Sequence, residues 1–225
     1  MRFVILHQAG PHGAAGPFPP AANGLTLHEH VALQPGTAAV RIDFPGGTPR
    51  HVAGAFDGTR QLAGLGIIEA DSRQAAIAWL QASPAIDAEF EIRETGCAGG
   101  LPGVDLSTGA TKPRFLILVK ADAATEAEAP SDAGRLAAMA KRNDEGVKAG
   151  MLLAGDGLRS TASGTRVKFA GGKTRVLDGP FAEAKELVAG YWLVQADSLD
   201  DAIAWVHRYP YAQERPEVEI RPVSG

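Results

Sequence analysis

The chain has 225 residues, 45% of them hydrophobic and 21% charged, and its formal net charge is −4. This length allows one large domain or two domains of about 100 residues, and either can bury a core. With this small acidic excess, the chain has no surplus of basic residues to neutralise phosphates, so nucleic acid is not an expected partner.

The first predicted strand is residues 2–6, within the N-terminal run MRFVILHQ. Its apolar part is far too short for a signal peptide, and no apolar run in the chain reaches membrane-spanning length. We therefore expect a cytoplasmic protein without a membrane partner. Residues 9–24 are too rich in Gly and Pro for a helix interior, so we expect a loop there, with at most a short helical segment around residues 27–33.

Two stretches of the sequence occur twice. Residues 2–6 (RFVIL) recur as residues 114–118 (RFLIL), displaced by 112. Residues 69–80 recur as residues 195–206, displaced by 126. The chain is therefore a tandem repeat, and its second copy has about fourteen more residues between these landmarks.

Residues 96–113 have the Gly, Pro, Ser and Thr content of an exposed linker. We place the domain boundaries there, with a degenerate repeat at residues 1–95 and a second repeat at residues 114–225. The single cysteine, Cys97, lies in this stretch and cannot form an intrachain disulfide. Because no histidine is near it in the sequence, a bystander thiol is favoured over a nucleophile.

The second repeat has the clearer pattern of apolar runs, caps and turns. In chain order it predicts a buried strand at residues 115–120, a helix capped by Ser131 or Asp132 and ended by Gly150, a hairpin at residues 165–169 and 173–177, a strand at 187–196, a helix between Ser198 and Pro210, and a strand at 217–223. This order is that of a ferredoxin-like α+β sheet with its helices on one face. The other face must be covered, and the sister sheet is the nearest surface.

The motif at residues 178–181 (DGPF), with residues 150–158 (GMLLAGDGL) before it and 190–199 (GYWLVQADSL) after it, resembles the YCII-related, or DGPF-domain, family. The resemblance covers nearly all of residues 113–223 and, more weakly, residues 1–95. It implies that two ferredoxin-like repeats form a dimeric α+β barrel within one chain, with a cleft between the sheets. The family is similar in fold to muconolactone-isomerase-like proteins and small monooxygenases. It includes members for which a His/Asp active site is suggested and members that occur beside sigma factors.

The same motif aligns residues 50–56 (RHVAGAF) with residues 175–181 (RVLDGPF), displaced by 125. The first repeat therefore has alanine where the second has Asp178 and Pro180. Any chemistry of Asp178 is then confined to the second repeat. Phe181 matches Phe56 and is interpreted as a core anchor that also borders the substrate.

Three acidic residues are candidates for chemistry or binding. Asp178 is a general base, or an acid if burial raises its pKa, and the alternative is an Asx turn before Pro180. Glu186 lies in the charged segment that follows and would divide acid and base roles with Asp178, unless that segment is a solvated helix face. Asp156, between two glycines, is a substrate contact or a turn former.

The histidines supply a second set of candidates. His51 aligns with Val176, two residues before Asp178, and therefore faces the same side of its strand. His7 aligns with Val119 in the first strand. If the bare sheet faces meet, His51 or His7 approaches Asp178 across the interface and forms a His/Asp acid–base pair. The alternative is a histidine that is exposed or bonded to a backbone carbonyl.

Tyr191 and Trp192 fall on opposite faces of one strand, so one is expected at the cleft and the other under the helices; we include Tyr191 among the substrate contacts. His28 and His30 could form a metal half-site, but no further ligand lies nearby, so no metal is expected. No dinucleotide fingerprint or nucleophile elbow is present, and no cofactor is expected.

These features favour a cofactor-independent small-molecule enzyme with acid–base chemistry in the inter-sheet cleft. Its catalytic residues are Asp178, His51 and Glu186, and its substrate contacts are Asp156, His7, Tyr191 and Phe181. The alternative is a non-catalytic ligand-binding or regulatory module linked to transcription. The expected partner is a small molecule, and the chain is expected to be a monomer with an internal pseudo-dimer or a homodimer.

Overall fold

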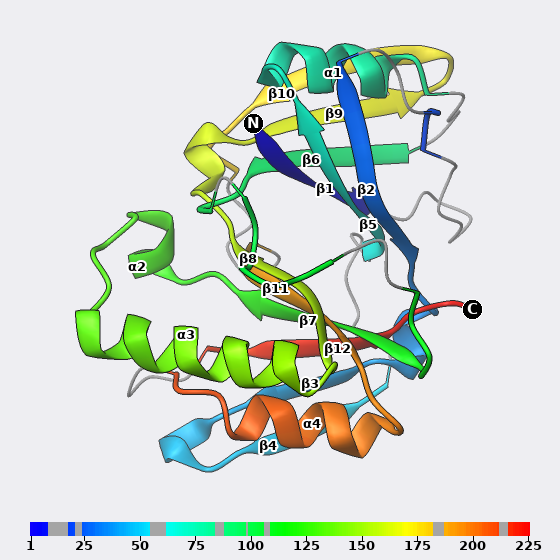
Figure 1. The fold of residues 1–225 in the computed structure, drawn as a ribbon. Coiled ribbons are helices and arrows are strands. Elements are labelled where there is room, and N and C mark those ends of the chain that lie inside the picture. The colour runs from blue at the N-terminus through cyan, green and yellow to red at the C-terminus, as the bar shows by residue number, and fades with distance from the viewer. Residues whose placement is uncertain are drawn as a thin grey trace.

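The computed structural model describes residues 1–8, 18–20, 24–54, 62–83, 88–97, 99–105, 109–181, 187–211 and 216–225. These residues form an α+β structure with two six-stranded antiparallel sheets and helices on the outside (Figure 1). Within the described ranges, none of the helices has the length and apolar character needed to cross a membrane.

The two sheets have the same internal order. The first contains β10 (Lys173–Asp178), β9 (Thr165–Ala170), β6 (Ala88–Glu94), β1 (Arg2–Gln8), β5 (Leu62–Ala70) and β2 (Leu25–Ala32). The second contains β4 (Arg50–Ala53), β3 (Val40–Asp43), β12 (Val218–Pro222), β7 (Arg114–Lys120), β11 (Val188–Gln195) and β8 (Leu152–Gly157). Besides its hairpin, each half contributes four strands to one sheet. When these four are numbered along the chain, their order across the sheet is fourth, first, third, second.

The two halves exchange their hairpins. The predicted hairpin β9–β10 is present, but β9 pairs with β6 of the first half. Likewise, β3 and β4 of the first half extend the second sheet, because β3 pairs with β12. Figure 1 shows β9 and β10 beside β6 at the top and β3 and β4 beside β12 at the bottom. Chain order alone assigns each hairpin to its own half, and the structure corrects this: neither sheet is complete without the other half.

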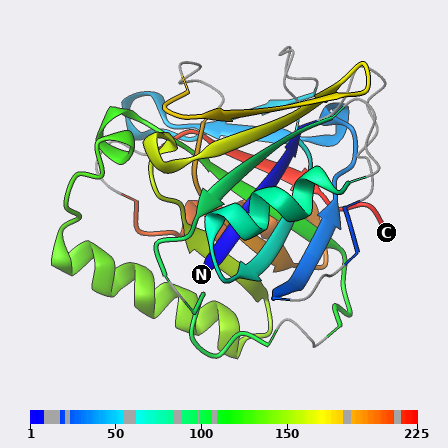
Figure 2. The ribbon, with the colours of Figure 1, turned by 90° about the horizontal axis from the view of Figure 1, so that it is seen from above.

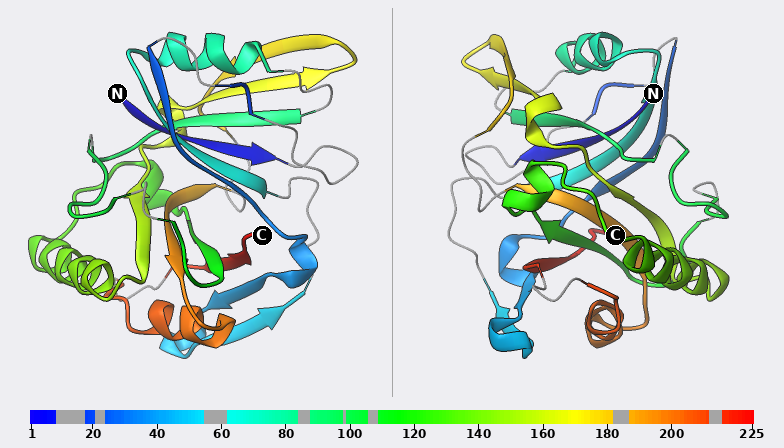
Figure 3. Two further views of the ribbon diagram at one scale, coloured as in Figure 1. Left: turned by 45° about the vertical axis from the view of Figure 1, so that its right-hand side comes forward. Right: turned by 90° about the vertical axis from the view of Figure 1, so that its left-hand side faces the viewer.

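Three apolar clusters hold the layers together. Between the sheets, Leu6 and Ile67 of the first pack in one buried cluster with Leu118 and Leu193 of the second. Burial of each such side chain contributes roughly 1.5–3 kcal/mol relative to exposure. The outer faces are covered by α1 (Arg73–Gln81) on the first sheet and by α3 (Ala133–Lys148) and α4 (Leu199–His207) on the second. The layers therefore run helix, sheet, sheet, helix (Figure 3), and the view from above in Figure 2 shows α1 lying across the first sheet.

The helices of the two halves match in packing, and their predicted caps are confirmed. Trp79 and Trp205, which occupy equivalent positions in the repeated segments 69–80 and 195–206, are both buried against a sheet. The Ser198 side chain accepts a hydrogen bond from the Asp201 amide at 3.2 Å, as a helix N-cap does. At the start of α3 the cap is Asp132, which accepts from the Arg135 amide at 2.9 Å.

Two strands differ from expectation. Residues 27–33, where at most a short helical segment is expected, lie largely in β2. Residues 152–157 form β8, a strand that is not predicted because the glycines of GMLLAGDGL interrupt the apolar pattern. These strands are equivalent in the two halves, since each forms one edge of its sheet beside the third strand of its repeat. The predicted loop at residues 9–24 lies mostly outside the described residues.

Candidate functional site

A polar cluster of Arg2, Asp156 and Tyr191 lies between the sheets, where the two repeats meet. Tyr191 belongs to the apolar cluster between the sheets, and Asp156 is its cross-strand partner on β8, so both side chains are on the inner face. The Tyr191 hydroxyl donates to Asp156 Oδ2 at 3.3 Å. Arg2 reaches this oxygen from β1 of the other repeat, with its Nε at 3.4 Å.

Burial dominates the electrostatics of the Asp156 carboxyl. Its side chain is 0% exposed and that of Arg2 is 10% exposed. Desolvation raises the pKa of Asp156 to about 6, although Arg2 and the Tyr191 hydrogen bond act in the opposite direction. Asp156 Oδ1 has no hydrogen-bond partner among the residues that the structure describes. A carboxyl with a pKa near neutrality and an unused oxygen is equipped to take up and release a proton.

The partners of Asp156 have complementary properties. Burial, followed by the neighbouring Asp156, raises the pKa of the Tyr191 hydroxyl far above its ordinary value, so this group stays protonated and remains a donor. Arg2 is held by its backbone, since its carbonyl accepts from the Thr95 amide at 3.2 Å. Its guanidinium lies against Gly100, where an added Cβ would be 2.6 Å from the guanidinium carbon. The linker thus covers the arginine and leaves no room for a side chain there.

Sequence reasoning missed Arg2, although a signal was present. Arg2 and Arg114 begin the repeated RF-x-IL segments. Each reaches an acidic residue on the second strand of the other repeat: Arg2 pairs with Asp156, and Arg114 Nη1 lies 3.2 Å from Glu29 Oε2. Glu29 is partly exposed, whereas Asp156 is buried. The Arg2–Asp156 and Arg114–Glu29 pairs occupy equivalent places in the two repeats. Asp156 is the buried carboxyl, and its pKa is raised.

A second repeated motif flanks this junction. Residues 89–93 (EFEIR) recur as residues 217–221 (EVEIR), displaced by 128. The apolar members, Phe90 and Ile92 in the first copy, pack under the helices. The charged members therefore lie on the opposite, inner face of the strand.

Each copy of this motif binds an arginine from an exchanged hairpin. In the first copy, Glu91 accepts from Arg93 at 3.0 Å and from Arg166 of β9 at 2.9 Å. In the second copy, Arg221 donates to Glu219 at 3.2 Å, and Arg41 of β3 lies 3.0 Å from Glu217. Arg93 and Arg221 also donate to backbone carbonyls, those of Arg159 and Gln34. These charges, buried around Glu91 and partly exposed in the Arg41–Glu217 pair, fasten each hairpin to the sheet it has joined.

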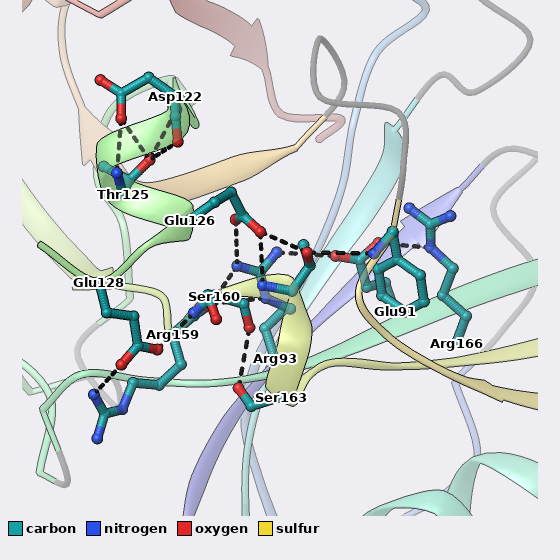
Figure 4. A network of polar contacts seen from close by, with 12 residues as sticks. Glu91, Arg93, Asp122, Thr125, Glu126, Glu128, Arg159, Ser160, Ser163 and Arg166 are labelled. Atoms are coloured by element: carbon teal, nitrogen blue, oxygen red, sulfur yellow. Dashed lines mark hydrogen bonds and ion pairs between the residues drawn. The ribbon is translucent and has the colours of Figure 1, made fainter.

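The first copy is extended by α2 (Ala123–Glu126) and by the short helical turn η3 (Thr161–Ser163), as Figure 4 shows. Glu126 Oε2 accepts from the Thr161 amide at 3.0 Å and from its hydroxyl at 2.5 Å. Glu128 accepts from the Ser160 amide at 2.9 Å and from Arg159 at 2.8 Å. Because its charges are mutually paired, we interpret this network as structural.

Asp178, the leading sequence candidate, lies elsewhere. Its side chain is exposed, and its Oδ1 accepts a hydrogen bond from the Thr165 hydroxyl at 2.9 Å. Thr165 is paired with both Asp178 and Ile92, and Ile92 packs on the helix side of the sheet. Cross-strand partners share a face, so Asp178 is directed away from the sister sheet. The expectation that the Asp178 side chain faces the inter-sheet interior is therefore wrong.

The residues after this turn have separate outcomes. Phe181 is half-buried, and the Arg166 guanidinium lies 3.8 Å from the centre of its ring, a cation–π contact in agreement with an anchoring role. Glu186 and Phe56 lie outside the described residues. A surface hollow of about 420 Å³ is lined by residues 111–112, 149–151, 195–197, 201 and 208, and none of the predicted site residues is among them.

The predicted His/Asp pair is not brought together. His51 is on β4, at the edge of the second sheet, and its Nε2 lies 3.0 Å from Nε2 of His207, whereas Asp178 is on β10, at the edge of the first. In Figures 1 and 3 these strands lie at opposite ends of the molecule. The two residues are apart because their strands are the edge strands of different sheets.

His7 also differs from expectation. It is fully buried on the helix side of the first sheet, stacked on Phe90 with 4.3 Å between ring centres. Burial, and secondarily His30, lowers the pKa of His7 to about 4. His28 contacts Glu69 and His30 contacts Phe18, because an irregularity in β2 between Leu27 and Glu29 separates the two imidazoles. Tyr191 and Trp192 do lie on opposite faces, with Tyr191 between the sheets and Trp192 under the helices, as predicted.

Comparison with known proteins agrees with the repeat and the motifs. The family model of the YCII-related domain matches two segments, residues 1–95 and 114–224. An uncharacterized protein of Rhizobium meliloti (strain 1021) is 34% identical over 79 residues, which are 35% of this chain and 64% of that protein. The matched region thus spans less than two thirds of that relative. Because the family model covers most of the chain in two copies, the protein belongs to the YCII-related family as a tandem repeat.

Proposed function

We propose that the protein is a cofactor-independent acid–base catalyst that acts on a small organic molecule, with Asp156 as the proton-transferring group. The observation that carries this proposal is the environment of the Asp156 carboxyl. Its side chain is fully buried, its Oδ1 has no partner within the described part of the chain, and it lies between the Tyr191 hydroxyl and the Arg2 side chain of the other repeat. Asp156 thus takes the role of general base that the sequence suggests for Asp178.

The proposal extends to the architecture around this carboxyl. We infer that each four-strand core is a ferredoxin-like unit and that the pair forms an α+β barrel within one chain. The support is the strand order fourth, first, third, second, which occurs in both halves, together with the shared apolar cluster between the sheets. A site at this interface draws residues from both repeats, which explains why one repeat alone would lack Arg2 or Asp156.

The arrangement suits removal of a proton from a carbon atom beside a carbonyl group. Ionised Asp156 accepts the proton on Oδ1, and the electron pair of the C–H bond moves toward the carbonyl oxygen. The negative charge that develops there is stabilised by the Arg2 guanidinium and the Tyr191 hydroxyl. Return of the proton to another carbon completes an isomerisation without a further reactant. A base with a pKa of about 6 is ionised at neutral pH and still able to return the proton.

The second candidate is a non-catalytic ligand-binding or regulatory module. The complete burial of the Asp156 side chain favours it, because the apolar cluster between the sheets contains Tyr191 and the linker covers Arg2. In this case the ion pair serves only to join the repeats. The two candidates differ in whether Asp156 exchanges protons with a bound molecule.

The test follows exchange of carbon-bound hydrogen for deuterium by NMR, using a panel of small ketones, keto acids and lactones in D₂O. We expect at least one compound to be deuterated by the wild type, at a rate that rises as pH increases through about 6, the pKa of Asp156. Asp156→Asn keeps the shape of the side chain and should reduce the rate by about 10²–10⁴, the usual contribution of a general base. Tyr191→Phe should lower the rate less, because Arg2 remains.

Asp178→Asn is the matched comparison, since it makes the same chemical change at an exposed carboxyl. We expect it to leave the exchange rate unchanged. Loss of exchange in Asp178→Asn but not in Asp156→Asn would refute the proposal and return the chemistry to the 178–181 turn. A wild type that deuterates no compound of the panel would favour the non-catalytic candidate.

A further inference from the structure

His51 and His207 form a pair of imidazoles outside the proposed acid–base site. Their Nε2 atoms lie 3.0 Å apart, the ring centres are 5.0 Å apart, and the ring planes are inclined by 40°. His51 is exposed and His207 is partly exposed. Solvent and dissolved ions therefore reach the pair.

The hairpin exchange creates this pair. His51 is on β4, a strand of the first repeat that is attached to the second sheet, and its cross-strand partner is Ile42. Ile42 is buried in the apolar cluster that also contains Trp205 and Val206 of α4, so His51 lies on the α4 side of the sheet. His207 is the last residue of α4. One imidazole thus comes from each repeat.

We propose that His51 and His207 together bind a late first-row divalent transition ion, such as Zn²⁺, Ni²⁺ or Cu²⁺, through their Nε2 atoms. If an ion lay at the usual metal–nitrogen distance of 2.0–2.1 Å from both Nε2 atoms, which are 3.0 Å apart, the N–metal–N angle would be about 95°. This angle lies between those of square-planar and tetrahedral coordination, the geometries of Cu²⁺ or Ni²⁺ and of Zn²⁺.

Binding of the ion requires one proton to move within one ring of the pair and needs no other reactant. In the metal-free pair one Nε2–H donates to the other Nε2, so one ring has its proton on Nε2. On binding, that proton moves to Nδ1 of the same ring, and both Nε2 lone pairs face the ion. The described residues contain no group of three or more His, Cys, Asp or Glu arranged to hold a metal. The site therefore offers two protein ligands, and water completes the coordination.

The ion would join the two halves at one of the two equivalent junctions between an exchanged hairpin and a helix. By the displacements of 125 and 126, the equivalent residues at the other hairpin are Val176 and Gln81. Neither is an imidazole, and both are exposed. Among the described residues, this paired arrangement of imidazoles therefore occurs at one of the two junctions. Binding of the ion should hold β4 against α4 and stabilise the exchanged hairpin, because a ligand that binds only the folded chain favours folding.

The experiment titrates the full, untagged, metal-free chain with Zn²⁺ by calorimetry and repeats the titration with Ni²⁺ and Cu²⁺. We expect binding of one ion per chain and a higher thermal unfolding temperature with Zn²⁺ present. His51→Ala and His207→Ala should each weaken the affinity by more than the roughly 10–100-fold that loss of an outer-shell partner costs. His28→Ala, at another solvent-accessible histidine, is the matched control and should leave affinity unchanged.

Because His51 and His207 are at the surface, both variants should fold, and circular dichroism checks this. A converse variant builds the missing copy: Val176→His combined with Gln81→His should add a second Zn²⁺ site. Unchanged Zn²⁺ affinity in either single alanine variant, or no binding of any of the three ions by the wild type, would overturn the proposal.

Discussion

Replacing Asp156 by asparagine should stabilise the protein at neutral pH, because the native carboxyl ionises in a site that disfavours its charge. Its folded pKa of about 6 lies about 2 pH units above the ordinary value of 3.8, and each unit corresponds to 1.36 kcal/mol. Ionisation of Asp156 in the folded chain therefore lowers the free energy of unfolding by about 3 kcal/mol relative to a neutral side chain. Asparagine has a similar shape and can still accept the Tyr191 hydrogen bond.

The sign of the pH dependence distinguishes this effect from a simple loss of contacts. Below about pH 4 the carboxyl is protonated in both the folded and the unfolded chain, so its charge makes no difference. Between about pH 4 and 6 the unfolded chain releases its proton first, and the stability of the wild type falls as pH rises. Above about pH 6 the full difference from the asparagine variant is present.

Urea unfolding of both proteins across this pH range measures the difference. We expect the free energy of unfolding of the variant, minus that of the wild type, to increase by about 3 kcal/mol between pH 4 and pH 7. Asp178→Asn changes an exposed carboxyl and should not reproduce this increase. A difference that stays constant across the range would refute the reasoning about burial.

Three further predictions concern the interlocked fold. Arg93→Met should lower the free energy of unfolding by about 1–3 kcal/mol in urea, because it removes one of the two arginines bound to buried Glu91 and takes from the Arg159 carbonyl its buried donor, while Arg166 remains on Glu91; an unchanged free energy of unfolding would contradict the structural role of the network. Gly179→Ala should cost at least about 1–3 kcal/mol in the same assay, because its Cβ would lie 1.8 Å from the Thr161 carbonyl oxygen. Gly157→Ala, where nothing lies within 4 Å, is its control. Residues 1–95 and 114–225 expressed separately should lack cooperative unfolding by circular dichroism and recover it on mixing; independent cooperative folding of either half would show that the exchanged hairpins are dispensable.

Much of the secondary structure is readable from local patterns. The repeated RF-x-IL strands, the Ala170-Gly171-Gly172 hairpin and the capped helices follow from residues close together in the sequence. The strand β8 is concealed because its glycines break the apolar pattern, although they allow close packing: a Cβ at Gly155 would lie 2.7 Å from the Trp192 ring. The sheet that each hairpin joins cannot be predicted from the sequence, because the local pattern does not distinguish the edge of one sheet from the edge of the other. The ion pairs that favour the sister sheet, such as Arg166 with Glu91, form only in the folded chain.

The candidate site is predictable only in its parts. Asp156 and Tyr191 could be singled out by residue type and strand position, but a shared role depends on their cross-strand pairing on a strand that was not recognised. Arg2 enters through a contact between the two sheets, and the raised pKa of Asp156 comes from burial. The motif of residues 178–181, which carries the resemblance in the sequence, lies at an exposed turn whose Gly179 packs against the Thr161 carbonyl oxygen. It does not contain the carboxyl whose pKa burial raises to about 6.

The most direct test of the central claim is an NMR titration of the Asp156 side-chain carboxyl carbon in the intact wild-type protein, assigned with the Asp156→Asn variant. If this group is a buried proton-exchanging acid at the junction of the repeats, its resonance should shift with a midpoint near pH 6. A midpoint near 3.8, the ordinary value for an aspartate, would contradict the account.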